Sequence, residues 1–313
     1  MAAELLHAPL RGAYCDLSEL TAARFAAQHL QWRQLRRARA LQSGMRRSAL
    51  RGRGLEFEEV RAYQAGDDVR TIDWRVTARS GRAFTKLFRE ERERPLLLAV
   101  DQRQPMYFGS RYCLKAKLAA WLGAVLAWRG IDEGDRVGGL VFGNDARRDI
   151  RPRRNRRTVL AWLQALHEFN HRLDHHTLLD DAAGSLQAAL TNLERIARPG
   201  SSVVLISDLS GADQLPLAER LSRIARHCET TVILVADPLE QELPPPGQYG
   251  VTDGRQRLLI DTGDAELRAR FAAAAEARHR ALRQTLASIG VPLLSAATSL
   301  PPLAGLTQPR VHA

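Results

Sequence analysis

The chain has 313 residues, of which 45% are hydrophobic and 26% are charged, and its formal net charge is +11 at pH 7. This composition is typical of a globular protein with one large domain, or with one domain and a smaller appendage. No apolar run reaches the roughly 18 residues that a membrane-spanning helix requires, and the start lacks a signal-peptide pattern. The three cysteines are far apart in the sequence, as is typical of reduced thiols. We therefore expect a cytoplasmic protein without membrane insertion.

Four segments follow one another along the chain. Residues 1–48 are predicted to form a basic helical segment, and residues 49–94 form a charged segment with glycine and aromatic residues. Residues 95–300 alternate between strand and helix patterns, and residues 301–313 form a tail. This order predicts an α/β domain preceded by a helical segment and a small β-containing clasp that packs on it.

Alternating apolar and polar residues predict a hairpin in the charged segment, from the strands Leu55–Val60 and Ala83–Phe88. In the α/β domain we expect strands at Leu96–Val100, Asp135–Phe142, Ser201–Ser207, Glu229–Ala236 and Val291–Leu294. Arg147–Arg151 is predicted to pair with the second of these, and Arg257–Asp261 to add an edge strand. Helices are expected at Ser110–Arg129, Thr158–Asn170, Asp180–Ile196, Ala212–His227 and Asp264–Ile289.

Repeated strand–helix–strand units with short connections predict an α/β fold with a doubly wound, mostly parallel, Rossmann-like sheet. Gly138 and Gly139 lie inside a strand pattern, which indicates a bulge or a close backbone approach. Ligands of such sheets bind at the carboxyl ends of the strands. Two predicted strands end in an aspartate, Asp101 and Asp208, and we expect the functional site there.

One long pattern in residues 49–94 is more specific than any other in the chain. Its fixed positions are Gly54, Glu56, Arg61, Tyr63, Gly66, Asp67, Asp68, Arg70, Asp73, Trp74 and Arg79. This pattern resembles the signature of the bacterial domain-of-unknown-function 58 family, and we call residues 49–94 the signature segment. The resemblance implies a von Willebrand factor A-like fold with a metal-ion-dependent adhesion site. It also implies a non-catalytic protein that works with a MoxR-type AAA+ ATPase and an unidentified client protein.

The adhesion-site pattern that the family implies is Asp-x-Ser-x-Ser, followed by a threonine and an aspartate from later loops. Asp101 matches the first position, and Thr177 and Asp208 can be aligned with the last two. Arg103 and Pro105 replace the two serines. Mg²⁺ prefers several oxygen ligands, so the loss of two hydroxyls and the added guanidinium argue for a degenerate, metal-free site. We expect no cofactor and an ion pair from Arg103 to Asp101 or Asp208, with Mg²⁺ as the alternative.

Partner docking is predicted at the carboxyl ends of the strands. The residues expected there are Asp101, Arg103, Met106, Thr177 and Asp208, helped by Arg153 and Arg154 from the basic run 143–157. An acidic partner surface would complement that run and make the association sensitive to salt. For the signature segment, both a structural role and a docking role stay open.

Two other classes of function were weighed. His167 and His171 fit the HExxH pattern of zinc hydrolases, with Glu194 as a conceivable third ligand, and a metal-dependent hydrolase or nuclease is therefore one alternative. A nucleic-acid-binding module using the basic residues of 31–47 and 143–157 is another. Against the second, residues 51–94 contain 11 Lys/Arg and 9 Asp/Glu, and no base-reading motif is present. A glycine-rich phosphate loop is also absent from the sequence, so the chain is not itself a P-loop ATPase.

Overall fold

A computed structural model describes residues 8–30, 56–63, 72, 74–89, 95–176, 181–252 and 257–307. The contacts divide the chain into two units, Met1–Arg46 with Arg94–Ala313, and Arg47–Glu93. The first unit is the α/β domain, which therefore includes the helix at the start of the chain. The second unit corresponds to the signature segment.

In the α/β unit the described helices are α2 (Leu17–Ala27), α5 (Lys115–Asp132), α6 (Arg156–Asn170), α7 (Ala182–Ile196), α8 (Leu217–Ala225), α9 (Ala265–Ser288) and α10 (Ala304–Thr307). Its strands are β3 (Pro95–Asp101), β4 (Arg136–Phe142), β5 (Arg147–Arg153), β6 (Ser202–Ser207), β7 (Glu229–Ala236), β8 (Gln248–Thr252), β9 (Arg257–Asp261) and β10 (Leu293–Ala297). Short 3-10 turns follow β3 at Gln104–Met106 (η2), β6 at Ala212–Gln214 (η3) and β7 at Pro238–Glu240 (η4).

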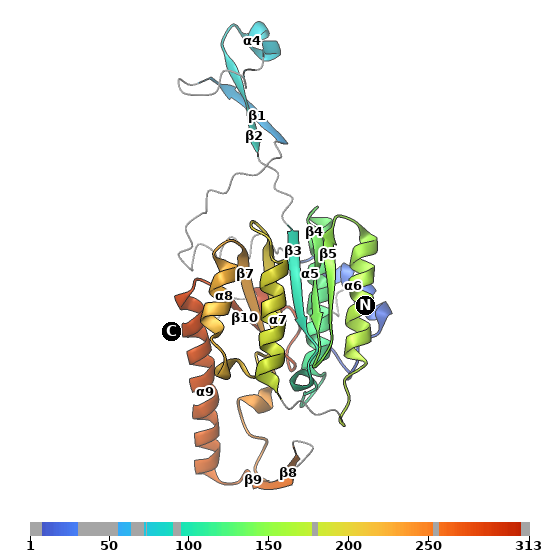
Figure 1. The fold of residues 1–313 in the computed structure, drawn as a ribbon, viewed down its shortest axis with the longest axis vertical. Coiled ribbons are helices and arrows are strands. Elements are labelled where there is room, and N and C mark those ends of the chain that lie inside the picture. Colours follow the sequence, from blue (N-terminus) through green and yellow to red (C-terminus); the bar gives the residue numbers. More distant parts are fainter. Residues whose placement is uncertain are drawn as a thin grey trace. The chain divides into compact units, whose positions relative to one another are not determined.

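In the described residues, six strands form one sheet in the order β10-β7-β6-β3-β4-β5 (Figure 1). Neighbouring strands are parallel except β5, which runs antiparallel to β4 along the edge of the sheet. The fold is thus α/β with a mostly parallel sheet, as predicted. A short turn reverses the chain between β4 and β5, where the Gly143 amide donates to the Ala146 carbonyl at 2.8 Å. Pro152 in β5 is acceptable because an edge strand leaves one side of its backbone unpaired.

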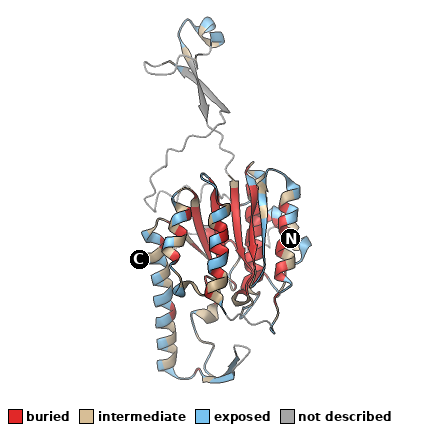
Figure 2. Ribbon diagram, in the orientation of Figure 1, coloured by how far each residue is buried: buried red, intermediate tan, exposed pale blue. Residues whose placement is uncertain are grey.

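Helices cover both faces of the sheet, and the alternation along each strand explains this arrangement. In β3, Leu96, Leu98 and Val100 face a core cluster formed with α2, α5 and α6. Leu97 and Ala99 face the other cluster, which contains residues of α7 and α8 together with the end of α9. The four inner strands, β7, β6, β3 and β4, are buried on both faces (Figure 2), which is why they read as continuous apolar runs.

Two glycines let neighbouring elements approach one another closely. A Cβ at Gly139 of β4 would lie 2.0 Å from the carbonyl oxygen of Leu98 in β3. The register of β4 and β5 also shifts between Val137 and Gly139. The predicted bulge and close approach at this position are therefore confirmed. In α5, a Cβ at Gly123 would lie 2.8 Å from the Trp162 ring of α6.

The N-terminal helix α2 is part of the α/β core. Leu20 is fully buried, and its carbonyl accepts a hydrogen bond of 3.1 Å from Nε1 of Trp128 in α5. Lys117 of α5 pairs with Glu19 at 2.8 Å. The basic residues 31–47, predicted to be helical, lie outside the described residues.

β8 and β9 correct one expectation from the sequence. Arg257–Asp261 was expected to extend the main sheet, but this strand pairs antiparallel with β8 in a separate two-stranded sheet. The preceding segment 243–247 contains three consecutive prolines, which lack the amide that a sheet ladder requires, and the β8–β9 hairpin that follows lies apart from the main sheet (Figure 1). Leu258 and Leu259 are 64% and 68% exposed there.

The signature segment contains the predicted hairpin, formed by β1 (Glu56–Ala62) and β2 (Phe84–Arg89), with α4 (Trp74–Ser80) between them. The Phe84 amide donates to Thr77 Oγ1 at 3.1 Å, which connects α4 to β2. Trp74 is 71% exposed. That the segment packs as a clasp on the α/β unit stays a prediction.

Of the signature positions, Glu56 and Arg61 lie in β1, Tyr63 follows it, and Trp74 and Arg79 lie in α4. The other six lie outside the described residues: Gly54, Gly66, Asp67, Asp68, Arg70 and Asp73.

Candidate functional site

Three adjacent parallel strands end in an aspartate. Asp101 is the last residue of β3, Asp208 follows β6, and Asp237 follows β7. Because β3, β6 and β7 are neighbours in the sheet, these carboxylates lie along one edge. The sequence predicted the first two as a site; the third follows the same strand-end pattern but was not singled out.

Arg103 and Asp101 form a buried ion pair, as expected from the sequence. Arg103 Nη2 lies 2.7 Å from Asp101 Oδ2, and Nε lies 3.0 Å from Oδ1. The Arg103 amide also donates to Oδ1 at 2.9 Å, and the Ser207 hydroxyl donates to Oδ2 at 2.6 Å. Both charged side chains are 0% exposed. Each oxygen of Asp101 therefore has more than one donor from the protein itself.

The rest of the Arg103 guanidinium connects loops that are far apart in sequence. Its Nη1 donates to the carbonyl oxygens of Ala182 at 2.7 Å and Ser210 at 3.2 Å, and to Ser185 Oγ at 3.3 Å. Its Nη2 lies 3.8 Å from Asp208 Oδ1. Burial alone would lower the pKa of Arg103, but the charge and hydrogen bonds of Asp101 outweigh it and raise that pKa. The guanidinium is a permanent cation that joins β3, β6 and the start of α7.

Lys115 is a second buried cation of this edge. Its Nζ lies 2.7 Å from Asp208 Oδ2 and 2.5 Å from Glu240 Oε1. Burial opposes the charge, but the two carboxylates outweigh it and raise the pKa of Lys115. Burial likewise would raise the pKa of Asp208, whereas Lys115 and the amide of Ser210 lower it, and the net shift is downward.

Neither Lys115 nor Glu240 was singled out from the sequence. Lys115 is the first residue of α5, where a positive charge opposes the helix dipole. A lysine at that position of an apolar helix was a usable signal for a buried partner.

Asp237, after β7, bonds to the loops that follow β3 and β10 at the same edge. Its Oδ2 accepts hydrogen bonds from the Ser110 amide at 2.8 Å and from Thr298 Oγ1 at 2.5 Å. Its own amide donates to Glu240 Oε2 at 2.9 Å, within a capping box at η4. Burial would raise the pKa of Asp237, but these hydrogen bonds lower it. The loops after β3, β7 and β10 are thereby tied together.

These residues do not fit a divalent cation. Among the residues that the structure describes, no group of three or more His, Cys, Asp or Glu is placed to hold a metal ion. At the predicted cation position, the Arg103 guanidinium already takes the oxygens of Asp101, and Pro105 belongs to η2. Thr177, the other predicted ligand, lies outside the described residues.

The structure changes which residues can reach a partner at this edge. Asp101, Arg103 and Met106 are fully buried, and the side chain of Asp208 is 4% exposed. Direct contact with a partner was predicted for these four residues, but the fold encloses them. Phe108 lies on the outside instead: it is 41% exposed, and its ring centroid is 5.7 Å from Lys115 Nζ.

Arg153 and Arg154 correct a second part of the docking prediction. Both are exposed, but β5 runs antiparallel to β4, so Arg147 pairs with Phe142 and Arg153 pairs with Val137. The strand thus carries the chain back from the carboxyl edge of the parallel strands to their amino edge. Arg153 and Arg154 lie at the edge opposite to Asp208 and cannot share its surface.

The HExxH residues are at the end of α6. His167 Nδ1 is 2.9 Å from the Cys15 carbonyl, and His171 Nδ1 is 2.9 Å from the His167 carbonyl. Glu168 pairs with Arg148 at 2.7 Å. Glu194 lies on α7, which covers the opposite face of the sheet from α6. It therefore cannot complete a metal site with the two histidines.

Within the described part of the chain, no helix has the length and apolar character needed to cross a bilayer. Fold and site together define an α/β protein whose parallel strands end in a buried network of ion pairs. The model of the family described as "Protein of unknown function DUF58" matches residues 59–281, and the chain belongs to this family.

Relatives include uncharacterized proteins of Mycobacterium bovis and Mycobacterium tuberculosis. Each is 32% identical over 251 residues, which cover 79% of this chain and 76% of the relative. Among solved structures, similarity is found to the conserved hypothetical protein BatB from Bacteroides thetaiotaomicron, with a TM-score of 0.34 and 15% identity over 63% of this chain and 98% of that one. An aerotolerance-related membrane protein from Bacteroides fragilis gives a TM-score of 0.37 and 14% identity over 64% and 90% of the two chains.

Proposed function

We propose that the chain is a non-catalytic, von Willebrand factor A-like adaptor of the cytoplasm. In this proposal it binds a MoxR-type AAA+ ATPase and an unidentified client protein through the carboxyl edge of its sheet. The adhesion site of that edge is degenerate, with Arg103 in the role of the cation. The ATPase and the client are proposed from the family resemblance. The mode of binding is proposed from the geometry of the edge.

The observation that carries the proposal is the buried Arg103–Asp101 pair, with Nη2 and Oδ2 2.7 Å apart and both side chains 0% exposed. A guanidinium built into the chain cannot dissociate as Mg²⁺ can, so the loops it joins are held in one arrangement. A surface that is ordered before binding loses less conformational entropy when a partner docks. Such an edge suits constitutive protein binding.

The ionisable groups of the edge also argue against acid–base catalysis. A general acid or base works best with a pKa near the operating pH. Here the pKa of Asp208 is lowered and the pKa of Lys115 is raised, because the two groups pair with each other. Both pKa values are shifted further from pH 7, which favours a structural role for these groups over proton transfer.

Phe108 is the contact we assign to the partner. It is 41% exposed and lies against Lys115, whose partner Glu240 is 36% exposed on its side chain. An aromatic side chain with charged groups at its rim is a common anchor of protein–protein interfaces. Phe108 can contact a partner without any opening of the buried network beneath it.

Co-purification with a MoxR-type ATPase from the same genome tests the proposal. We expect the wild-type chain to retain the ATPase and the Phe108→Ala variant to lose most of it. Arg195→Ala is the control, because Arg195 is 70% exposed and lies in the last turn of α7, whereas Arg103 contacts the first residue of that helix. Failure of the wild-type chain to retain the ATPase, or equal retention by the Phe108→Ala variant, would contradict the proposal.

A thermal-shift titration addresses the metal-dependent alternative. We expect the Tm to stay unchanged on adding millimolar Mg²⁺ or Mn²⁺, because the guanidinium of Arg103 takes the Asp101 oxygens. A saturable rise in Tm with Mg²⁺ would favour the metal-dependent hydrolase or nuclease instead.

A further inference from the structure

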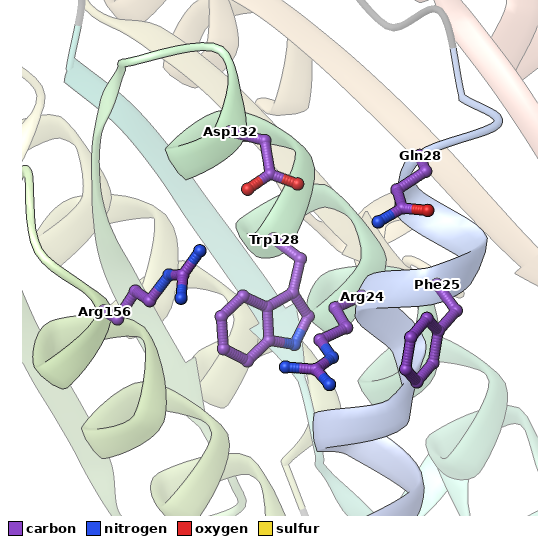
Figure 3. A pocket seen from close by; sticks show the side chains of 6 residues that line it. All are labelled: Arg24, Phe25, Gln28, Trp128, Asp132 and Arg156. Carbon is purple, nitrogen blue, oxygen red and sulfur yellow. The ribbon is translucent and has the colours of Figure 1, made fainter.

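A pocket with a cavity volume of about 250 Å³ opens between α2, the end of α5 and the start of α6. Because α5 runs back across the sheet from the carboxyl edge, the pocket lies near the amino ends of the strands. It is thus far from the ion-pair network. Its lining residues, shown in Figure 3, are Arg24, Phe25, Gln28, Trp128, Asp132 and Arg156.

Two aromatic side chains make the apolar part of the pocket. Trp128 is 5% exposed, and its Nε1 is held by the Leu20 carbonyl at 3.1 Å, so the indole is fixed in place. Phe25 is 41% exposed on α2. The guanidinium carbon of Arg24 lies 4.6 Å from the centroid of the Phe25 ring. The pocket therefore offers a rigid apolar surface beside a positive charge.

Several polar side chains at the rim are available to bind a ligand. Within the described part of the chain, the side chains of Gln28, Asp132 and Arg156 make no hydrogen bond or ion pair. Figure 3 shows the guanidinium groups of Arg24 and Arg156 on either side of the Trp128 indole. Two cations thus flank the apolar surface.

Further positive charge lies next to Arg156 in the sequence. Arg153 ends β5 just before α6, and Arg157 lies in the first turn of that helix; both side chains are exposed. Asp132 is the carboxylate that lines the pocket. The surface is therefore complementary to a ligand that is acidic around an apolar centre.

We infer that this pocket binds an acidic peptide segment of a partner protein. One large apolar side chain of the peptide packs mainly against Phe25, over the small exposed part of Trp128, and flanking carboxylates pair with Arg24 and Arg156. Gln28 can bond to a peptide amide through both its oxygen and its nitrogen, and Asp132 accepts from a peptide N–H. The site goes beyond the docking edge proposed above and does not depend on it.

A single-stranded nucleic acid fits the same pocket less well. Successive bases need a row of accessible aromatic faces, but of the two aromatic residues that line the pocket only Phe25 is widely exposed. The carboxylate of Asp132 would also repel a phosphodiester backbone, whereas it can accept hydrogen bonds from peptide amides. A peptide can use every group on the rim.

Fluorescence anisotropy with three short labelled peptides tests the inference. The first has a central tryptophan flanked by glutamates, the second has glutamines in place of the glutamates, and the third has alanine in place of the tryptophan. We expect saturable binding of the first peptide by the full chain and binding about tenfold weaker or more for each of the other two. Higher salt should weaken binding of the first peptide.

Protein variants then locate the binding site. The double variant Arg24→Gln, Arg156→Gln and the single variant Phe25→Ala should each weaken binding of the first peptide about tenfold. All three positions are exposed, so the fold should be retained, and thermal melting checks this. Arg195→Gln and Arg280→Gln, at exposed arginines outside both proposed sites, are the matched controls and should bind as the wild type does.

Four results would overturn the inference. The first is no saturable binding of the acidic peptide, and the second is equal binding of the glutamine peptide. The third is tighter binding of a labelled oligothymidylate that is lost in the double variant, which would identify a nucleic-acid site. Unchanged binding by the double variant would also exclude this pocket.

Discussion

At the scale of single residues, the guanidinium of Arg103 and the carboxylate of Asp101 are both removed from water, with side chains that are 0% exposed. Removing two charges from water is costly, and their attraction offsets that cost only when further hydrogen bonds complete the geometry. Here Ser207, Ala182 and Ser210 supply those bonds. The pair therefore contributes to stability as part of a network, and losing one member leaves the other charge buried and unpaired.

Replacing Arg103 with a residue of similar length but no charge tests this argument. We expect Arg103→Met to lower the free energy of unfolding by about 3–5 kcal/mol, because the Asp101 carboxylate stays buried without its cation. Urea unfolding followed by circular dichroism measures the change. Arg195→Met is the control: Arg195 also pairs with a carboxylate, Asp149, but it is 70% exposed, and we expect a change below about 1 kcal/mol. Equal changes in the two variants would refute the network.

The acid limit of stability depends on Asp208 and Asp237, whose pKa values are lowered in the folded chain despite burial. A lowered pKa means that the ionised form is favoured by folding. The resulting stability is present above the unfolded value of about 3.9 and is lost as pH falls through the lower folded value. We expect the urea midpoint to fall steeply below about pH 4. Lys115, whose pKa is raised, contributes no pH dependence in this range.

Asp208→Asn separates this effect from general acid denaturation. Because asparagine does not titrate, the variant should be less stable at pH 7 and should lose less stability between pH 7 and pH 3. A variant that follows the same pH profile as the wild type would show that Asp208 is not the group involved.

At the scale of elements, the contact between β3 and β4 depends on a glycine. A Cβ at Gly139 would lie 2.0 Å from the Leu98 carbonyl oxygen and 2.6 Å from the Leu98 amide nitrogen. Both atoms belong to the backbone of a central strand, so neither can move aside without disturbing the sheet. We expect Gly139→Ala to lower the free energy of unfolding by about 1–3 kcal/mol.

Gly250 of β8 provides the matched control for this substitution. It is also a strand glycine, but a Cβ there meets no atom within 4 Å. We expect Gly250→Ala to change stability by less than about 1 kcal/mol. Thermal melting of the two variants side by side measures the difference, and a larger loss for Gly250→Ala would contradict the close approach at Gly139.

The sequence was informative about elements whose pattern is local. Glu229–Ala236 was predicted with the bounds that β7 has in the structure, because an apolar run between polar residues marks a buried strand. Which sheet β9 joins depends on the strand with which it pairs, and no sequence pattern within β9 indicates that partner. The same limit applies to the site. Asp101 and Asp208 follow apolar runs and were found, whereas Glu240 follows β7 in a 3-10 turn and reaches Lys115 only through the fold.

At the scale of the whole α/β unit, the two ends of the parallel strands have different chemistry. The carboxyl edge contains buried ion pairs beneath an exposed aromatic residue, and the amino edge has exposed arginines around a pocket. Arg147 pairs with Phe142 and Arg153 pairs with Val137, which lies five residues earlier in β4. At roughly 3.3 Å per residue, the two arginines are about 17 Å apart. This exceeds the Debye length of about 8 Å at physiological ionic strength, so they act on different surfaces.

Arg147 and Arg153 therefore form a pair of probes on one strand. If the ATPase docks at the carboxyl edge, Arg147→Gln should weaken its binding about two- to fivefold at low salt and reduce the dependence on salt. Arg153→Gln should leave both unchanged, because its charge is screened from that edge. Surface plasmon resonance over a range of NaCl concentrations measures both variants under the same conditions. An effect of Arg153→Gln equal to that of Arg147→Gln would contradict docking at the carboxyl edge and place the partner along the whole of β5.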